Sequence, residues 1–137
     1  MRVKGIAWLG TRTDRFNEMV HFARDVLGLS EPYRLKHDFA VFDLPNGDLF
    51  EIFGPSDTDH RFMTCPVGGF LVDDVEEARA EMERKGVTFI GPVHRASDGN
   101  AWTHFRASDG HVYEITSGRR GALGHSGLGS GSRKGSG

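Results

Sequence analysis

The sequence predicts an α+β protein built from two tandem β-α-β-β-β units, and a repeated hairpin is the main reason. Residues 101–116 read AWTHFRASDGHVYEIT, in which polar and apolar residues alternate on both sides of Ser108-Asp109-Gly110. This is the pattern of two strands joined by a glycine turn. Residues 39–53, FAVFDLPNGDLFEIF, align on this hairpin without gaps and place Glu51 at the position of Glu114, 63 residues later. Two such hairpins at corresponding positions indicate an internal duplication.

Each hairpin is preceded by the pattern of a strand and a helix. In the first half, residues 3–9 form an apolar run that is typical of a strand. Thr13 and Asp14 are candidates for the N-cap of a helix in which apolar residues recur at helical spacing, and Gly28 ends that helix. A further short strand then leads into the hairpin. The first unit therefore spans residues 1–54.

The second half repeats this order after a linker. Residues 55–66 are polar and contain two prolines, which predicts an irregular linker. The second unit spans residues 67–117, and its helix begins at Asp74, where Glu77 three residues later resembles a capping box. Residues 118–137 contain eight glycines and four serines, so we expect a disordered Gly/Ser-rich basic tail with too little apolar surface to fold.

Composition excludes several classes of function. The tail carries four basic residues and no acidic one, so with a net charge of −2 for the whole chain, residues 1–117 hold −6. A body of that sign without a basic stripe predicts no nucleic-acid partner. Cys65 is the only cysteine, which rules out an intrachain disulfide and a thiolate metal cluster. No stretch approaches the ~20 apolar residues of a membrane span and no signal peptide is evident, so we expect a cytoplasmic protein with no membrane partner.

The final hairpin carries the first functional hypothesis. If residues 108–110 form its loop, His104 faces Glu114 and shares a face with Trp102 and Arg106, because strand side chains alternate with a period of two. An imidazole beside a carboxylate either positions a ligand or serves as an acid/base couple, which makes His104 and Glu114 the catalytic candidates. The alternative is that the two groups only satisfy each other in a partly buried core.

Three stretches resemble motifs of the vicinal oxygen chelate superfamily, which holds glyoxalase I, bleomycin-resistance proteins, fosfomycin-resistance enzymes and extradiol dioxygenases. Residues 21–29, HFARDVLGL, look like its first-helix signature, with Ala23 where a tyrosine is common. Residues 72–86, VDDVEEARAEMERKG, look like its second helix, and residues 108–115, SDGHVYEI, look like its closing hairpin. The resemblance covers residues 3–117. It implies that the two units form a cup-shaped mixed sheet with the helices on its convex face.

The resemblance also implies a divalent metal inside the cup, held by one ligand from the first strand and one from the last strand of each unit. Glu51 and Glu114 match the two ligands of the last strands. The two first-strand positions fall on Ala7 or Trp8 and on Val67, and none of these residues binds a metal. The ligand set is therefore incomplete, and we expect no cofactor.

The incomplete ligand set favours a binding protein over an enzyme. A third interpretation, an interaction module with a filled cup, is disfavoured because Gly68-Gly69 and His104 indicate an unfilled face. We expect the binding protein to hold an aromatic or polycyclic small molecule in the cup, in the manner of bleomycin-resistance proteins, against aromatic walls with few polar groups. The predicted ligand-binding residues are Trp8, Phe39, Glu51, Phe53, Trp102, His104, Arg106 and Glu114.

The alternative is a lyase, isomerase or dioxygenase-type enzyme. It would work either without metal, by acid/base chemistry of His104 and Glu114, or with a divalent metal in a rearranged site of Glu51, Glu114 and His104. The second form uses the minimum of about three protein ligands that a catalytic metal site needs beside its open position.

Further predictions concern the rim of the cup and the remaining histidines. Arg106 is expected either to pair with Asp43 at the rim of the cup or to hold a ligand carboxylate. His60 is interpreted as a solvated histidine of the linker, with a position at the mouth of the pocket as the alternative. The surface histidines are predicted to be His21, His37, His94 and His111. The family resemblance further implies a homodimer.

Overall fold

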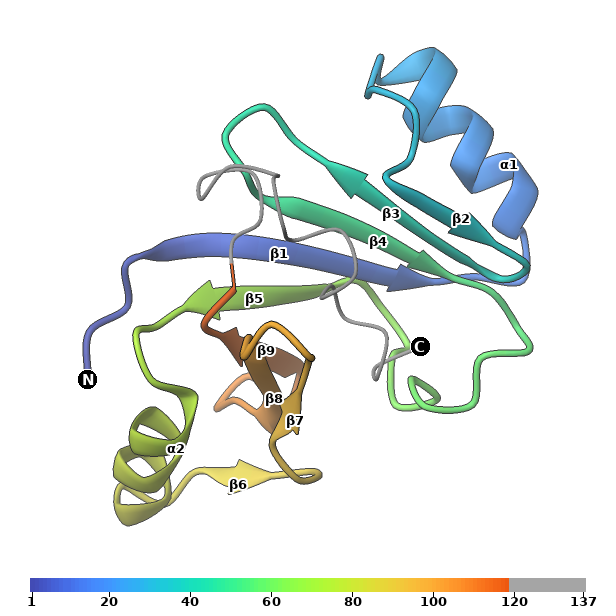
Figure 1. Ribbon diagram of the computed structural model, residues 1–137. Helices are drawn as coiled ribbons and strands as arrows, with labels where there is room; N and C mark the ends of the chain where they lie inside the picture. The colour runs from blue at the N-terminus through green and yellow to red at the C-terminus, as the bar shows by residue number, and fades with distance from the viewer. Residues whose placement is uncertain (119–137) are drawn as a thin grey trace.

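The structure of the protein is a computed structural model that describes residues 1–118, whose strands form one mixed sheet (Figure 1). Its elements are β1 (Gly5–Arg12), α1 (Phe16–His21), the π-helical η1 (Phe22–Val26), β2 (Arg34–Lys36), β3 (Phe39–Asp43), β4 (Leu49–Phe53), β5 (Val67–Leu71), α2 (Val75–Arg84), β6 (Thr88–Phe89), β7 (His94–Arg95), β8 (Ala101–Arg106) and β9 (Val112–Thr116). Across the sheet the order is β2-β3-β4-β1-β5-β9-β8-β6, with β7 paired to β8. The α+β class is confirmed. Apart from Gly118, the predicted tail lies outside the described residues.

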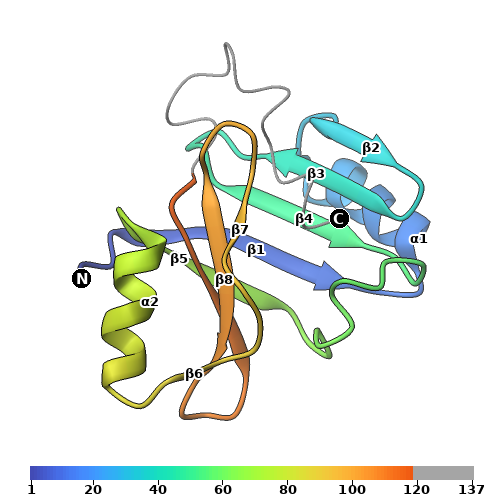
Figure 2. The same ribbon diagram turned by 60° about the horizontal axis from the view of Figure 1, so that its bottom comes forward.

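The predicted duplication is visible in the strand pairing. In the first unit β1 runs parallel to β4, and β4 pairs antiparallel with β3. In the second unit β5 runs parallel to β9, and β9 pairs antiparallel with β8. The antiparallel pair of β1 and β5 joins the two units, and Figure 2 shows these two strands side by side at the centre of the sheet. The sheet is therefore two copies of one arrangement joined through their first strands.

The helix ends show where local sequence signals decide the structure. Asp74 is the N-cap of α2, and its side chain accepts a hydrogen bond from the Glu77 amide at 2.9 Å, as the sequence predicts. At α1 the N-cap is Arg15, and the Thr13 hydroxyl accepts from the Arg15 amide at 3.0 Å instead of capping the helix. The predicted first helix also changes from α to π geometry at Phe22. Along the described chain, no helix has the length and apolar character that crossing a membrane requires.

Two strands differ from the sequence prediction. β1 extends to Arg12 rather than ending at residue 9, because its last residues pair with β4 along their whole length. β7 is an additional strand that follows Gly91-Pro92 and pairs His94 with Trp102. The extra hairpin of β7 and β8 adds a short strand to the sheet beside Trp102.

The two helices cover the same face of the sheet. α1 and η1 place Phe16, Val20 and Ala23 against Ala40, Phe42, Phe50 and Ile52. α2 places Val75, Ala78 and Met82 against Ala101, Phe105 and Ile115. Side chains alternate along each strand, so the register assigns another set to the opposite face, which we call the inner face. It carries Trp8, Gly10, Val41, Glu51, Gly69, His104 and Glu114.

The linker covers part of the inner face. Residues 55–66 are irregular, as predicted, but Met63 is buried in a hydrophobic cluster with inner-face side chains of the first unit. Phe62 packs against the same cluster, and His60 is only 3% exposed. The linker is therefore a packed part of the molecule and not a solvated connection.

Candidate functional site

A pocket of about 340 Å³ lies on the inner face of the second unit. Three segments line it: the linker, the chain from Ile90 to His94 of β7, and β8. The lining residues are Asp59, His60, Phe62, Ile90, Gly91, Pro92, His94, Trp102 and His104. The pocket thus joins apolar and aromatic walls to three imidazoles, which is the composition of a small-molecule site.

His104 and Glu114 form the first polar pair of this site. They are cross-strand partners in the hairpin of β8 and β9, as the sequence predicts. His104 Nε2 lies 3.1 Å from Glu114 Oε1, and the two side chains are 6% and 1% exposed. The contact is at ion-pair distance without the alignment of a hydrogen bond. Nε2 is therefore the ring nitrogen that faces the carboxylate.

His60 and Asp57 form a second pair, contributed by the linker. His60 Nδ1 lies 2.8 Å from Asp57 Oδ2, and the side chains are 3% and 7% exposed. The His60 ring stacks on Phe53 at 3.9 Å between centroids and meets the His104 ring edge-on at 6.3 Å. The interpretation of His60 as a solvated histidine is therefore wrong, because stacking and a buried carboxylate fix it in the pocket wall.

Trp102 and His94 make the wall at β7 and β8. Their rings stack with 5.9 Å between centroids and an interplanar angle of 22°. Burial, followed by the neighbouring His104 and His60, lowers the pKa of His94, although Asp59 and Glu114 act in the opposite direction. His94 is half-buried in this wall, so its interpretation as a surface group is wrong.

A bulge in β1 turns Trp8 onto the inner face. The pairing of β1 with β5 shifts between Ile6 and Trp8, so Ala7 and Trp8 are both buried although they are adjacent. The Trp8 ring meets His104 edge-on, with 6.2 Å between centroids. A Cβ atom added at Gly10 would overlap the six-membered ring of Trp8, and one at Gly69 would lie 3.0 Å from both Trp8 Cβ and Glu114 Oε2. The indole therefore fills the space between the two units.

The family metal site does not fit this arrangement. Glu51 pairs in register with Gly10 on β1, and Glu114 pairs with Gly69 on β5, so neither neighbouring position offers a ligand. Trp8 fills the space that such ligands would need. Within residues 1–118, no three histidine, cysteine, aspartate or glutamate side chains are grouped to hold a metal ion. The side chains present on the inner face are therefore unsuited to the metal of the family.

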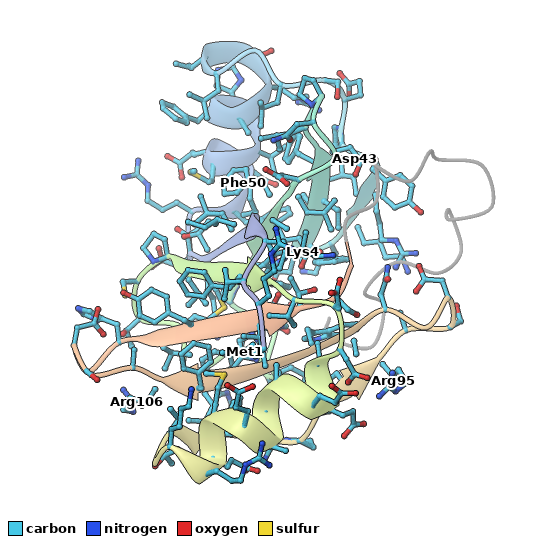
Figure 3. All side chains as sticks on the ribbon, turned by 90° about the vertical axis from the view of Figure 1, so that its left-hand side faces the viewer. Met1, Lys4, Asp43, Phe50, Arg95 and Arg106 are labelled. Carbon is cyan, nitrogen blue, oxygen red and sulfur yellow. The ribbon has the colours of Figure 1, made fainter. Side chains whose placement is uncertain are left out.

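The predicted site residues separate into three groups. Trp102 and His104 line the pocket, and Glu114 lies directly behind His104. Trp8, Phe39 and Phe53 are buried in the hydrophobic cluster of the first unit and do not line the pocket. Glu51 is completely buried on β4 beside this cluster. Arg106 is exposed and donates to the Gly110 carbonyl at 2.7 Å, and Figure 3 shows it at the far end of the molecule from Asp43.

Sequence reasoning gave the linker side of the pocket only as an alternative for His60. It missed Asp59 and Phe62, which belong to a stretch interpreted as a polar, irregular linker. One signal was present, because the segment from His60 to Met63 places two large apolar side chains in an otherwise polar stretch. Such residues in a loop favour packing onto a neighbouring surface over exposure.

A protein family and several solved structures are similar to this chain. The family model described as Glyoxalase/Bleomycin resistance protein/Dioxygenase superfamily matches residues 5–115. The methylmalonyl-CoA epimerase of Streptomyces coelicolor, in complex with 2-nitronate-propionyl-CoA, has a TM-score of 0.64 at 18% identity, over 84% of this chain and 94% of that chain. No curated protein matches the sequence.

Two further solved structures are similar to the same extent. The methylmalonyl-CoA epimerase of Mycobacterium tuberculosis has a TM-score of 0.62 at 16% identity, over 83% of this chain and 87% of that chain. A structure described as an NAD-dependent benzaldehyde dehydrogenase from Legionella pneumophila has a TM-score of 0.61 at 16% identity, over 80% and 96%. At these identities the similarity shows the fold alone.

Proposed function

Since the chain belongs to the glyoxalase, bleomycin resistance protein and dioxygenase superfamily, we propose that it binds a small aromatic molecule on its inner face. The observation that supports this is the pocket of about 340 Å³ between the linker and β8. Its volume is at the lower end of the range for small-molecule sites, about 300–1,000 Å³. We therefore expect a ligand of one or two rings rather than a large polycyclic one.

The pocket walls support an aromatic ligand in particular. Phe62 from the linker and Trp102 from β8 are aromatic residues of the lining, and Ile90 and Pro92 add apolar surface. Aromatic pairs gain about 0.5–1.5 kcal/mol beyond the burial of their area. His60 and His104 are held by carboxylates and supply fixed polar groups that orient the ligand.

The ligand of the Streptomyces epimerase is a less suitable candidate. That structure contains a coenzyme A derivative, and coenzyme A carries phosphate groups. Phosphates are bound by arginine, lysine or helix N-termini, and neither arginine nor lysine occurs among the nine residues that line this pocket. A small uncharged or basic aromatic compound fits the lining better.

Ligand titration tests the proposal. Single-ring, two-ring and polycyclic aromatic compounds are added to the full chain, and binding is followed by tryptophan fluorescence. We expect saturable quenching by the smaller compounds, and affinity lower by about three- to tenfold in Phe62→Ala, which removes one ring face. Phe22→Ala is the matched control, because Phe22 is 42% exposed on η1, away from the pocket lining. Quenching that no member of the panel saturates would refute the proposal.

An enzyme that works by acid/base chemistry is the second candidate, favoured by the buried pair of His104 and Glu114. A carboxylate that fixes an imidazole beside a pocket is the arrangement of a general base. In this case His104 would exchange a proton with the substrate while Glu114 holds Nε2, as in a lyase or isomerase. Product formation detected by NMR, and lost in both His104→Gln and Glu114→Gln, would support this candidate over simple binding.

We also propose that the protein is a cytoplasmic homodimer, as the sequence predicts. Exposed apolar side chains support the dimer: Ile6 and Leu9 on β1 and Leu27 after η1 are 63%, 45% and 54% exposed. They border an apolar pocket of about 260 Å³. Contiguous exposed apolar surface of this kind favours association. Sedimentation velocity tests it, because a Leu9→Asp variant is expected to sediment as a monomer at concentrations where the unmodified chain is a dimer.

A further inference from the structure

We propose that the inner-face pocket selects cationic aromatic ligands, such as arylamidines or protonated arylamines, over neutral and anionic ones of the same shape. This inference rests on the proposed function, since it concerns the ligand of the same pocket. The observations behind it are the charged side chains around the pocket and the partners with which these side chains already pair.

Three carboxylates surround the pocket, whereas the cation on the linker side, Arg12, donates to the Asp57 carbonyl at 3.0 Å and is not a lining residue. Asp59 lies exposed in the lining, while Asp57 and Glu114 stand directly behind His60 and His104. If both paired imidazoles were protonated, they and Arg12 would balance these three carboxylates. With neutral imidazoles the carboxylates exceed the cations.

His94 does not compensate for this excess. Its pKa is lowered by burial and by the two neighbouring histidines, against the opposite effect of Asp59 and Glu114, so the pocket favours the neutral form of His94. A protonated ligand placed among these groups gains attraction from the carboxylates, and the partly buried pocket screens that attraction less than water does.

Nearby arginines do not supply a positive charge to the lining. Arg79 donates to the Gly91 carbonyl at 2.6 Å but pairs with Glu83 at 3.2 Å. Arg95, next to His94, pairs with Glu76 at 2.7 Å. Arg61 is exposed and is not one of the lining residues. A carboxylate or phosphate on the ligand would therefore meet no arginine in the pocket lining.

The aromatic walls strengthen the same preference. Phe62 and Trp102 both line the pocket, and the face of an aromatic ring attracts a cation through its quadrupole. A flat ligand that carries a delocalised positive charge uses both features, because its ring stacks while its charge faces the carboxylates. Neutral ligands use only the first feature.

Three ligands of nearly equal shape test the inference on the full chain: benzamidine, benzamide and benzoate, which are positive, neutral and negative at neutral pH. Dissociation constants are measured by calorimetry and by tryptophan fluorescence at low and high salt. We expect benzamidine to bind about tenfold more tightly than benzamide, and benzoate to bind most weakly. High salt should reduce the advantage of benzamidine, because it screens the exposed Asp59.

Two variants locate the charge preference. Asp59→Asn is expected to weaken benzamidine by about threefold and to leave benzamide unchanged. Glu31→Gln is the matched control, because Glu31 is an 83% exposed carboxylate on another part of the surface. Arg61→Gln should leave the ranking of the three ligands unchanged.

The possible results separate this inference from the proposed function. Equal affinity for benzamide and benzamidine, or tightest binding of benzoate, would overturn the charge preference while leaving aromatic binding intact. Failure of all three ligands, together with failure of the wider aromatic panel, would overturn both.

Discussion

Replacing Gly10 with alanine measures how tightly Trp8 fills the inner face. The added Cβ would lie inside van der Waals contact of Trp8 Cζ2 and Cη2. β1 is a central strand between β4 and β5, so its backbone has little freedom to move away. Over-packing a filled core costs about 1–3 kcal/mol, and we expect Gly10→Ala to lower the free energy of unfolding by about 2 kcal/mol.

A second substitution shows whether the Trp8 indole causes the loss of stability in Gly10→Ala. Trp8→Leu removes the ring and should itself cost about 3 kcal/mol, because it leaves a cavity in the core. In that background the alanine methyl enters vacated space, so Gly10→Ala should be nearly neutral. The expected coupling free energy is therefore about 2 kcal/mol. Gly68→Ala is the control, because a Cβ at Gly68 meets nothing within 4 Å.

Urea unfolding followed by far-UV circular dichroism gives these free energies without relying on the fluorescence of Trp8. The control should stay within about 0.5 kcal/mol of the unmodified chain. If Gly10→Ala costs the same with and without the indole, the coupling is zero and Trp8 does not fill the space that family metal ligands would occupy. A loss below about 0.5 kcal/mol in the first variant would refute the packing argument as well.

Other groups of the inner face give three further predictions. Asp57→Ala leaves His60 without its buried partner and should lower the free energy of unfolding by about 3 kcal/mol in urea titrations, whereas an unchanged midpoint would mean that the pair is not formed. Metal analysis of untagged protein should find no bound zinc, nickel, manganese or iron, and near-stoichiometric metal lost in both His104→Ala and Glu114→Ala would contradict this. The free energy of unfolding should fall as the pH decreases below about 6.5. The pKa of His94 is lower in the folded than in the unfolded chain, so the unfolded chain binds the proton at a higher pH. His94→Phe should flatten that pH dependence, and an identical slope in both proteins would exclude His94 as its source.

The paired hairpins were predictable because their information is local. Turn residues and the alternation of side chains fix the register of each hairpin, so the facing of His104 and Glu114 followed from about a dozen consecutive residues. The cap of α2 at Asp74 was equally local, because its partner is the amide of Glu77. Arg106 shows the limit of such reasoning, since it has the predicted register but its side chain turns back to the hairpin loop.

The pocket itself was decided by contacts between distant segments. His60 meets His104 across 44 positions of the chain, and Asp59 reaches the pocket only because the linker folds over the inner face. The sequence alone determined the two units, their hairpins and the buried pair of His104 and Glu114, because each depends on periodicity and turns within one segment. Only the tertiary structure placed Trp8 between the two glutamate strands and His60 opposite His104. The physical reason is that those positions depend on a bulge, on two side-chain-free glycines and on how a loop packs against a sheet, and no short stretch of sequence contains that information.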